Sequence, residues 1–217
     1  MYKRQGCSCC PGGGRNLIGG RRAGDAGSGS ERPWVIVGLG NPGPEYAGNR
    51  HNVGFQVVEA LAGPGKFKAN KRAKALTWEG RVDDHRVVLV KPTTYMNESG
   101  QAVASLCSFY KVPPDRVIAV HDELDLPFGS LRLKLGGGDN GHNGLKSMRR
   151  SLGAGDFFRA RVGIGRPPGR MDPAAFVLRD FSASERSEVP LLVTRVTDAV
   201  TALMEKGLDF AQSQFND

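Results

Sequence analysis

Polar side chains that could perform chemistry gather in four short segments of this sequence. The segments read GLGNPGPEYAGNRHNVG from Gly38, KPTTYMNESG from Lys91, HDELDLP from His121 and GGGDNGHNG from Gly136. Together they supply histidines, carboxylates and amides. A histidine titrates near neutral pH, so a histidine held by a carboxylate can take a proton from water during hydrolysis. The four segments therefore predict a hydrolytic site.

A covalent mechanism lacks a nucleophile in the expected setting. The sequence has no G-x-S-x-G motif, and Cys107 falls in an apolar helical pattern, so direct attack by water is favoured over an acyl-enzyme. The alternative is a metal site whose ligands would be hard or borderline groups, namely His121, Asp122, Asp125 and His142. No H-E-x-x-H motif exists and the two histidines lie in different segments, so we expect no metal and no other cofactor.

The glycines of GLGNPG match the G-x-G-x-x-G spacing of dinucleotide-binding turns. That motif requires a helix directly after the glycines and an acidic residue about 20 residues further on. Here a polar run extends to Asn52 before apolar periodicity begins at Val53, and no Asp or Glu lies in residues 61–65. The sequence thus disfavours nucleotide binding and leaves a Rossmann-like oxidoreductase as a weaker alternative.

Alternating strands and helices must position the four polar segments. Short apolar runs predict strands at 34–37, 87–90 and 116–120, and helical spacing predicts helices over 53–62, 99–110, 145–152 and 188–206. Residues 130–136 and 157–165 alternate apolar and polar side chains, as half-exposed strands do. This alternation predicts an α/β domain with a sheet between helices. In open α/β sheets ligands bind beyond the carboxyl ends of the strands, where the polar segments fall.

Cations on the two alternating strands are candidates for contact with nucleic acid. Arg132 and Lys134 share one face of the first strand, and Arg159 and Arg161 share one face of the second. If the strands are neighbours, the four side chains form one basic patch. The net charge of +8 favours an acidic or nucleic-acid partner, whereas a solvated strand face is the alternative.

Residues 1–33 differ in composition from the remainder. They hold nine glycines and six Lys or Arg against two acids, without hydrophobic periodicity, which predicts a disordered basic tail before a domain at 34–217. Cys7, Cys9 and Cys10 lie in this tail without a second ligand cluster, so they do not predict a metal site. A transit peptide and a mis-assigned start codon are the alternatives for the tail. No apolar run approaches the roughly 18 residues that span a bilayer.

Five motifs in register resemble those of the bacterial-type peptidyl-tRNA hydrolases. They are GLGNPGPEYAGNRHNVG, KPTTYMNESG, HDELDLPFGSLRLKLGGG, GHNGLKS and RVGIGRP, and they cover most of residues 35–167. That family cleaves the ester between a peptide and the 3′ ribose of tRNA, which frees the peptide and recycles the tRNA. The resemblance implies a single α/β domain with a mixed, mostly parallel twisted sheet flanked by helices. It also implies a cytoplasmic monomer that needs no cofactor, membrane or obligate protein partner.

The resemblance implies roles for individual residues of the catalytic centre. His51 resembles the base that activates water, and Asp122 resembles the acid that holds this base. Asn41 resembles the residue that places the scissile carbonyl or the water. The glycines around Asn41 then serve a tight turn at the mouth of a cleft. A tRNA- or ribosome-binding module without activity is the alternative, but it does not require this set of side chains.

Further residues resemble the family's substrate contacts. They are Tyr46 and Met96 as cleft walls, Asn97 and Asn143 as binders of the peptide backbone and the tRNA end, and Lys134 and Arg161 as the clamp for the tRNA 5′-phosphate. Capping of the following helix is the alternative role for Asn97. The family often has GGGHGGHNG where this chain has GGGDNGHNG, so Asp139 places an acid near the tRNA path and would weaken binding.

Overall fold

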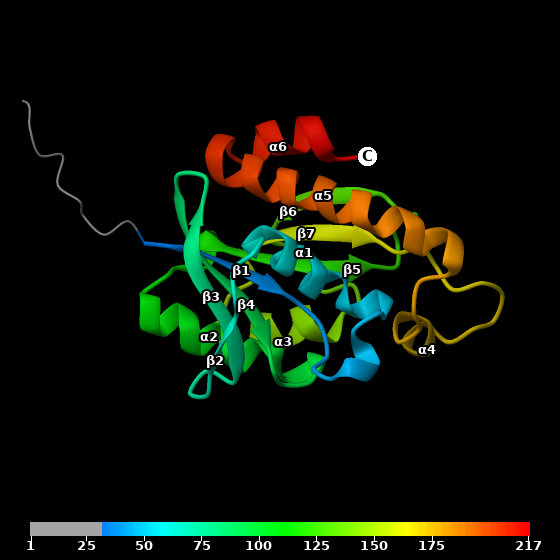
Figure 1. Ribbon diagram of the computed structural model, residues 1–217, viewed down its shortest axis with the longest axis horizontal. Helices are drawn as coiled ribbons and strands as arrows, with labels where there is room; N and C mark the ends of the chain where they lie inside the picture. Colours follow the sequence, from blue (N-terminus) through cyan, green and yellow to red (C-terminus); the bar gives the residue numbers. More distant parts are fainter. Residues whose placement is uncertain (1–31) are drawn as a thin grey trace, which may run out of the picture. The chain divides into compact units, whose positions relative to one another are not determined.

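A computed structural model describes residues 32–217, which form a seven-stranded sheet with helices on both faces (Figure 1). The strands are β1 (Trp34–Gly38), β2 (Lys68–Asn70), β3 (Ala75–Val82), β4 (His85–Pro92), β5 (Val117–Glu123), β6 (Leu131–Leu135) and β7 (Phe158–Gly163). The helices are α1 (Val53–Ala62), α2 (Ser99–Tyr110), α3 (Asn143–Leu152), α4 (Pro173–Val177), α5 (Ala183–Lys206) and α6 (Leu208–Phe215). The predicted tail, with its three cysteines, lies outside the described residues except for its last two positions. No helix within the described range is both long and apolar enough to cross a membrane.

The order of strands across the sheet is β2-β3-β4-β1-β5-β7-β6. The consecutive strands β4, β1, β5 and β7 are parallel. The remaining strands, β2 and β3 at one edge and β6 at the other, pair antiparallel. This topology confirms the expected α/β fold with a mixed, mostly parallel sheet. It also brings the loops that follow β4, β1 and β5 to the same edge of the sheet.

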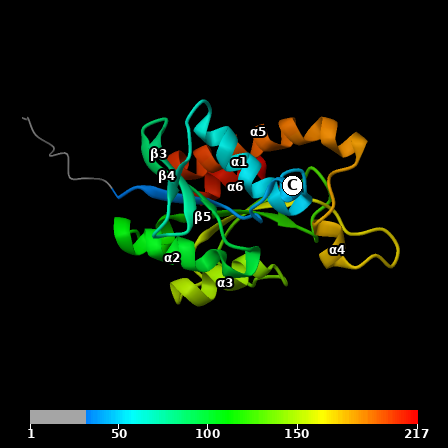
Figure 2. The same ribbon diagram turned by 60° about the horizontal axis from the view of Figure 1, so that its bottom comes forward.

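Two layers of helices bury the sheet, as Figure 2 shows. On one face α1, α5 and α6 pack on side chains that include Ile36 and Ile118. On the other face α2 and α3 cover a second cluster that includes Val37 and Phe157. Since β1 and β5 are buried on both faces, every residue of each strand is buried. This burial explains why their sequences read as continuous apolar runs before the polar ends.

The sequence patterns miss β2, β3, α4 and α6. In β3 buried positions alternate with more exposed ones, but Glu79, Gly80 and Arg81 interrupt the apolar signal. The strand forms because it pairs along its whole length with β4, through a turn in which Asp83 has a φ of 47°. Pairing between strands thus overrides a weak local preference.

The predicted start of the last long helix, at residue 188, is wrong by five residues. Helix α5 begins at Ala183, because Ser182 and Glu185 form a capping box that satisfies the first backbone N–H groups. Pro190 lies inside the helix and is exposed, so its ring disturbs only the solvent side of the first turns. Because proline usually ends or kinks a helix, Pro190 weakens the sequence signal of the helical turns before it.

A close approach of backbones positions the start of α1. A Cβ atom on Gly54 would lie 2.4 Å from the carbonyl oxygen of Val120 and 2.6 Å from the backbone nitrogen of Leu39. Only glycine fits this contact, which seats the first turn of α1 on the ends of β1 and β5. His51 lies three residues before Gly54, so the same contact places His51 at the carboxyl edge of the sheet.

We propose that residues 34–217 fold without the segment that precedes them, because all members of the two hydrophobic clusters in the described part lie at or after Trp34. A protein that begins at Trp34 is expected to melt within a few degrees of the full chain and to keep its activity. Differential scanning calorimetry checks the first expectation. A large loss of melting temperature would show that residues 1–33 stabilise the domain.

Candidate active site

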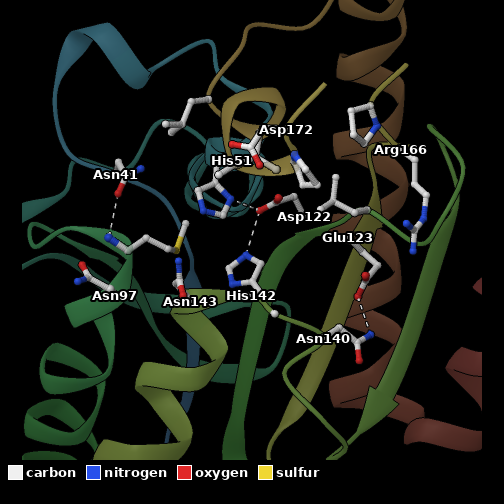
Figure 3. Close-up of a pocket in the computed structure, with 18 of the residues that line it drawn as sticks. Asn41, His51, Asn97, Asp122, Glu123, Asn140, His142, Asn143, Arg166 and Asp172 are labelled. Carbon is white, nitrogen blue, oxygen red and sulfur yellow. Dashed lines mark hydrogen bonds and ion pairs between the residues drawn. The ribbon is translucent and has the colours of Figure 1, made fainter. Parts of the chain in front are cut away.

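A cavity of about 880 Å³ lies at the carboxyl ends of the parallel strands (Figure 3). Seven of the nine predicted site residues line it: Asn41, Tyr46, His51, Met96, Asn97, Asp122 and Asn143. They follow β1 or β4, lie at the end of β5 or begin α3, so four separate parts of the chain build the cavity. The other two predicted residues, Lys134 and Arg161, lie outside it on β6 and β7.

The carboxylate of Asp122 is the centre of the polar network in this cavity. One of its oxygens, Oδ1, lies 2.8 Å from Nδ1 of His51 and 3.1 Å from Nε2 of His142 (Figure 3). Burial by itself would raise the pKa of Asp122, but the two imidazoles hold this pKa well below its ordinary value. Asp122 is therefore a carboxylate anion at neutral pH although its side chain is only 2% exposed.

Backbone contacts determine the tautomer of His142. The backbone N–H groups of Gly144 and Leu145 donate to Nδ1 of His142 at 3.2 and 3.4 Å, as expected where a side chain caps a helix. Nδ1 is therefore an acceptor, so in the neutral ring Nε2 carries the proton and donates it to Asp122. His142 holds the carboxylate in place while it caps α3.

Of the two histidines that line the cavity, His51 is the one that keeps a ring nitrogen free of partners among the described residues. Because Asp122 is ionised, Nδ1 of His51 carries a proton and donates it to the carboxylate. The Nε2 lone pair of a neutral His51 is then left to accept a proton. The side chain is 11% exposed and lines the cavity, so this nitrogen can meet a water molecule or a substrate.

Asn41 is held so that one end of its amide remains available. The backbone N–H of Met96 donates to Oδ1 of Asn41 at 2.8 Å, which leaves the two Nδ2 hydrogens without a partner among the described residues. Asn52 fixes the backbone of Asn41 from both sides: it accepts from the Asn41 N–H and donates to the Asn41 carbonyl, each at 2.9 Å. The sequence motifs assign no role to Asn52. Its burial beside His51 is the signal that marks it.

The remaining predicted residues line the cavity with different exposure. Asn97 and Asn143 are exposed, Tyr46 is half-buried and Met96 is buried. Asn97 lies one residue before Glu98, the N-cap of α2, and no side chain caps that helix. The alternative that Asn97 serves as a helix cap is therefore wrong.

One wall of the cavity comes from a segment that the motifs do not cover. Helix α4 and its neighbours contribute Asp172, Pro173, Ala174, Val177 and Leu178. Asp172 caps α4 by accepting from the N–H of Ala175 at 3.3 Å, and Pro173 is the first helical residue. An N-cap Asp followed by Pro is a signal for a helix start, which could have predicted this wall from the sequence.

The prediction that four cations form one surface patch is wrong for Arg159. Strands β6 and β7 are neighbours, with Arg132 opposite Arg161 and Lys134 opposite Arg159, so the expected pairing is confirmed. However, Arg159 is only 3% exposed, because its guanidinium donates to the backbone carbonyls of residues 137 and 138. This arginine supports the glycine-rich loop.

The other cations of the predicted patch remain at the surface to different degrees. Lys134 is exposed, whereas Arg161 donates through Nε to Glu123 at 2.9 Å and keeps 18% of its side chain exposed. Asp139, the residue that departs from the family motif, lies 3.4 Å from Arg149. Its charge is therefore partly balanced within the protein.

The predicted alternative set of metal ligands is not assembled. His121 donates through Nδ1 to the backbone carbonyl of Asp122, and burial lowers the pKa of His121 to about 3, so this ring is neutral. Asp125 is occupied by an ion pair with Arg166. Instead His51, Asp122 and His142 bring one ligand atom each within 4.8 Å of one another. In that trio the protons on His51 Nδ1 and His142 Nε2 point at the carboxylate, where a metal would need their lone pairs.

The thiol of Cys107 does not offer a nucleophile either. It is buried on α2, among the apolar side chains of the cluster that α2 and α3 cover. Burial raises the pKa of Cys107 to about 11, so the thiol stays protonated at neutral pH. A carboxylate-held histidine and an amide with free hydrogens, in a cavity at the carboxyl end of a parallel sheet, place the protein among α/β hydrolytic enzymes.

Comparison with known proteins gives the family. The sequence profile of the family described as peptidyl-tRNA hydrolase matches residues 35–217. A peptidyl-tRNA hydrolase of Streptomyces coelicolor is 58% identical over 191 residues, which cover 85% of this chain and 95% of the relative. One from Mycolicibacterium smegmatis is 54% identical, with coverage of 83% and 96%. The crystal structure of peptidyl-tRNA hydrolase from Acinetobacter baumannii superposes with a TM-score of 0.80 at 38% identity, over 88% of this chain and 97% of that chain. The chain therefore belongs to the peptidyl-tRNA hydrolase family, as the motifs predict.

Chelators are expected to leave the hydrolysis of a peptidyl-tRNA substrate unchanged. The reason is that the histidine protons of the trio are directed at Asp122. Dialysis against EDTA or phenanthroline, followed by a rate measurement, checks this expectation. Loss of the rate with recovery on adding zinc or manganese would instead make His51, Asp122 and His142 a metal site.

Proposed function

We propose that this chain hydrolyses the ester bond of peptidyl-tRNA with a water molecule that His51 activates. The observation that carries the proposal is the 2.8 Å contact between His51 and the ionised Asp122, at the wall of a cavity that also holds the amide of Asn41. The membership of the peptidyl-tRNA hydrolase family supports the choice of substrate. The proposed reaction uses only side chains of this cavity, so the proposal invokes no protein partner and no cofactor. We infer that the enzyme acts as a monomer in the cytoplasm, where tRNA is used.

The reaction would proceed by direct attack of water on the ester carbonyl. Nε2 of His51 takes a proton from the water as its oxygen bonds to the carbonyl carbon, and the resulting oxyanion accepts a hydrogen bond from Nδ2 of Asn41. The tetrahedral intermediate then breaks the bond to the 3′ oxygen of the ribose, which receives the proton from His51. Asp122 stabilises the imidazolium that exists between the two transfers.

The other cavity residues would hold the two parts of the substrate. Asn97, in the short 3-10 helix Met96–Glu98, and Asn143, the first residue of α3, present exposed amides on the same side of the cavity, which suits hydrogen bonds to the peptide backbone and to the tRNA end. Tyr46 and Met96 offer apolar surface next to them. The first test is to incubate the protein with N-acetyl-aminoacyl-tRNA and with the free-amino form and to measure release. Absence of release from the acetylated substrate would overturn the proposed function.

Replacement of the base is the sharper test of mechanism. His51→Ala is expected to lower kcat roughly 10²- to 10⁴-fold, the usual share of acid–base catalysis. Asp122→Asn is also expected to slow the reaction, since an amide can still accept from both histidines but carries no charge to stabilise the imidazolium. The measurement is kcat under saturating N-acetyl-aminoacyl-tRNA.

A matched control for these variants is His85→Ala, because His85 begins β4 at the opposite end of that strand from the cavity. It is expected to keep the wild-type rate. Near-normal turnover by folded His51→Ala protein would remove His51 from the mechanism.

We further propose that Lys134 and Arg161 hold the 5′-phosphate of the tRNA. They are diagonal neighbours on one face of β6 and β7, since Lys134 is opposite Arg159 and Arg161 lies two residues further along β7. Diagonal positions lie about 7–8 Å apart at Cα, close enough for two long side chains to meet one phosphate. Glu123 holds Arg161 in place and partly neutralises it, so Lys134 would carry more of the attraction.

Lys134→Gln is expected to raise KM for full peptidyl-tRNA about tenfold, the cost of one hydrogen bond to a charged group, with little change in kcat. The slope of log KM against log salt should fall by about 1. A short substrate with the peptide on a single adenosine lacks the 5′-phosphate and should not respond. Lys68→Gln, an equal loss of charge on the opposite edge strand β2, is the control. Equal losses on both substrates would refute the phosphate contact.

A further inference from the structure

Arg50, the residue directly before His51, is one of the few buried cations of the described chain. It is 6% exposed and begins the short 3-10 helix Arg50–Asn52, in which His51 is the central residue. The sequence motifs assign no role to Arg50, and its side chain does not line the cavity. A buried guanidinium is costly unless it is paired and hydrogen-bonded, so its contacts indicate what it is retained for. Both terminal nitrogens of Arg50 have partners, and Nε has none among the described residues.

The contacts of Arg50 all reach one distant part of the chain. Nη1 donates to the carbonyl of Asp180 at 2.6 Å and to that of Arg179 at 3.3 Å, and the backbone N–H of Arg50 donates to the same Arg179 carbonyl at 3.0 Å. Nη2 donates to Glu185 at 2.6 Å. These partners lie in the connection between α4 and α5 and in the first turn of α5.

Aromatic rings enclose the same guanidinium. Its central carbon lies 4.3 Å from the ring centroid of Phe176 and 5.4 Å from that of Phe181. Phe176 belongs to α4, whose other face lines the cavity through Val177 and its neighbours. One side chain therefore joins the segment that carries His51 to the wall formed by α4.

Glu185 connects Arg50 to the first turn of α5. Its Oε2 accepts from Arg50 and also from the backbone N–H of Ser182 at 2.7 Å, as part of the capping box of α5. Burial by itself would raise the pKa of Glu185, but the hydrogen bonds from Ser182 and the charge of Arg50 lower it below its ordinary value. The ion pair therefore stays formed through the neutral range, and α5 cannot shift without moving Arg50.

We propose that Arg50 is a positioning residue that keeps His51 and the α4 wall in one rigid arrangement, so that the base and the peptide-bearing end of the substrate meet at a set distance. The proposal rests on the role of His51 given under the proposed function. Arg50 touches no reacting atom. It acts by holding the 3-10 helix against α4 and α5. A misplacement of a catalytic group by about 1 Å can lower the rate about 10²-fold.

The test compares Arg50→Met and Arg50→Lys with the wild-type chain. Arg50→Met is expected to lower kcat about 10- to 100-fold on both full peptidyl-tRNA and the short peptidyl-adenosine substrate, since the contact is remote from the tRNA clamp. Arg50→Lys keeps the charge but not the fork of donors, so it should recover part of this loss. KM for the full substrate should change less than threefold.

Arg195→Met is the matched control. Arg195, on α5, also donates to two backbone carbonyls and a carboxylate, but its partners are Gly129, Phe215 and Asp217, away from the cavity. This variant should lose melting temperature as Arg50→Met does and yet keep the wild-type kcat. If both variants melt early and both keep kcat, Arg50 supports only the fold and the proposal is overturned.

A second measurement does not depend on activity. The Nδ1–H proton of His51 that is held by Asp122 should give a downfield NMR signal in the wild type and in Arg195→Met, and lose it through exchange in Arg50→Met. The Nε2–H of His142 should persist in all three as an internal reference. Retention of the His51 signal in Arg50→Met refutes positioning.

If Arg50→Met does not fold, the test uses the His51 NMR signal and the kcat of Arg50→Lys instead. Wild-type values for both in Arg50→Lys would refute the proposal. If His51→Ala remains active while the Arg50 variants lose the signal, the proposed role of His51 as the base fails and its positioning by Arg50 stands.

Discussion

A carboxylate anion in the interior, that of Asp122, is the constraint around which this site is built. Burial opposes the charge, and two imidazole N–H groups compensate for it from different parts of the chain. Removing one partner of such a buried pair typically costs about 3–5 kcal/mol. The fold must therefore bring the loop after β1, the end of β5 and the start of α3 to one point. The Gly54 contact and the cap of α3 by His142 are the means by which it does so.

The polar groups around this carboxylate are each held by hydrogen bonds to other residues. Asn52 holds the backbone of Asn41, Asn41 accepts from Met96, and His142 accepts from the first turn of α3. Such ties give each side chain one orientation and leave one end free: Nδ2 of Asn41 and Nε2 of His51. A site of this kind is preorganised, which is the condition for electrostatic stabilisation of a transition state.

Fewer cationic side chains are available to bind a substrate than the net charge of +8 suggests. Arg159 is used by the glycine-rich loop, Arg161 by Glu123, and Arg50 by the connection between α4 and α5. In contrast, the edge strand β2 and its flanks carry exposed cations far from the predicted clamp, namely Lys66, Lys68, Lys71, Arg72 and Lys74. Lysines on an edge strand discourage pairing with another chain. The place of a cation in the fold therefore decides whether it is suited to bind RNA.

Local patterns in the sequence were sufficient for the central strands, most helices, the four polar segments and the family. Buried parallel strands and amphipathic helices have a periodicity that a short window contains. Which of the three histidines near Asp122 keeps a free ring nitrogen at the cavity could not be read from residue types alone, because the tautomer and orientation of each ring depend on nearby backbone groups and on the Asp122 carboxylate, which lies 71 residues from His51 in the sequence. For the same reason the burial of Arg159, the pairing that forms β3, and the contacts of Arg50 with residues 129 to 135 positions further on were decided only by the tertiary structure. Residue type determines what a side chain can donate or accept, whereas only the folded chain determines which partner it meets.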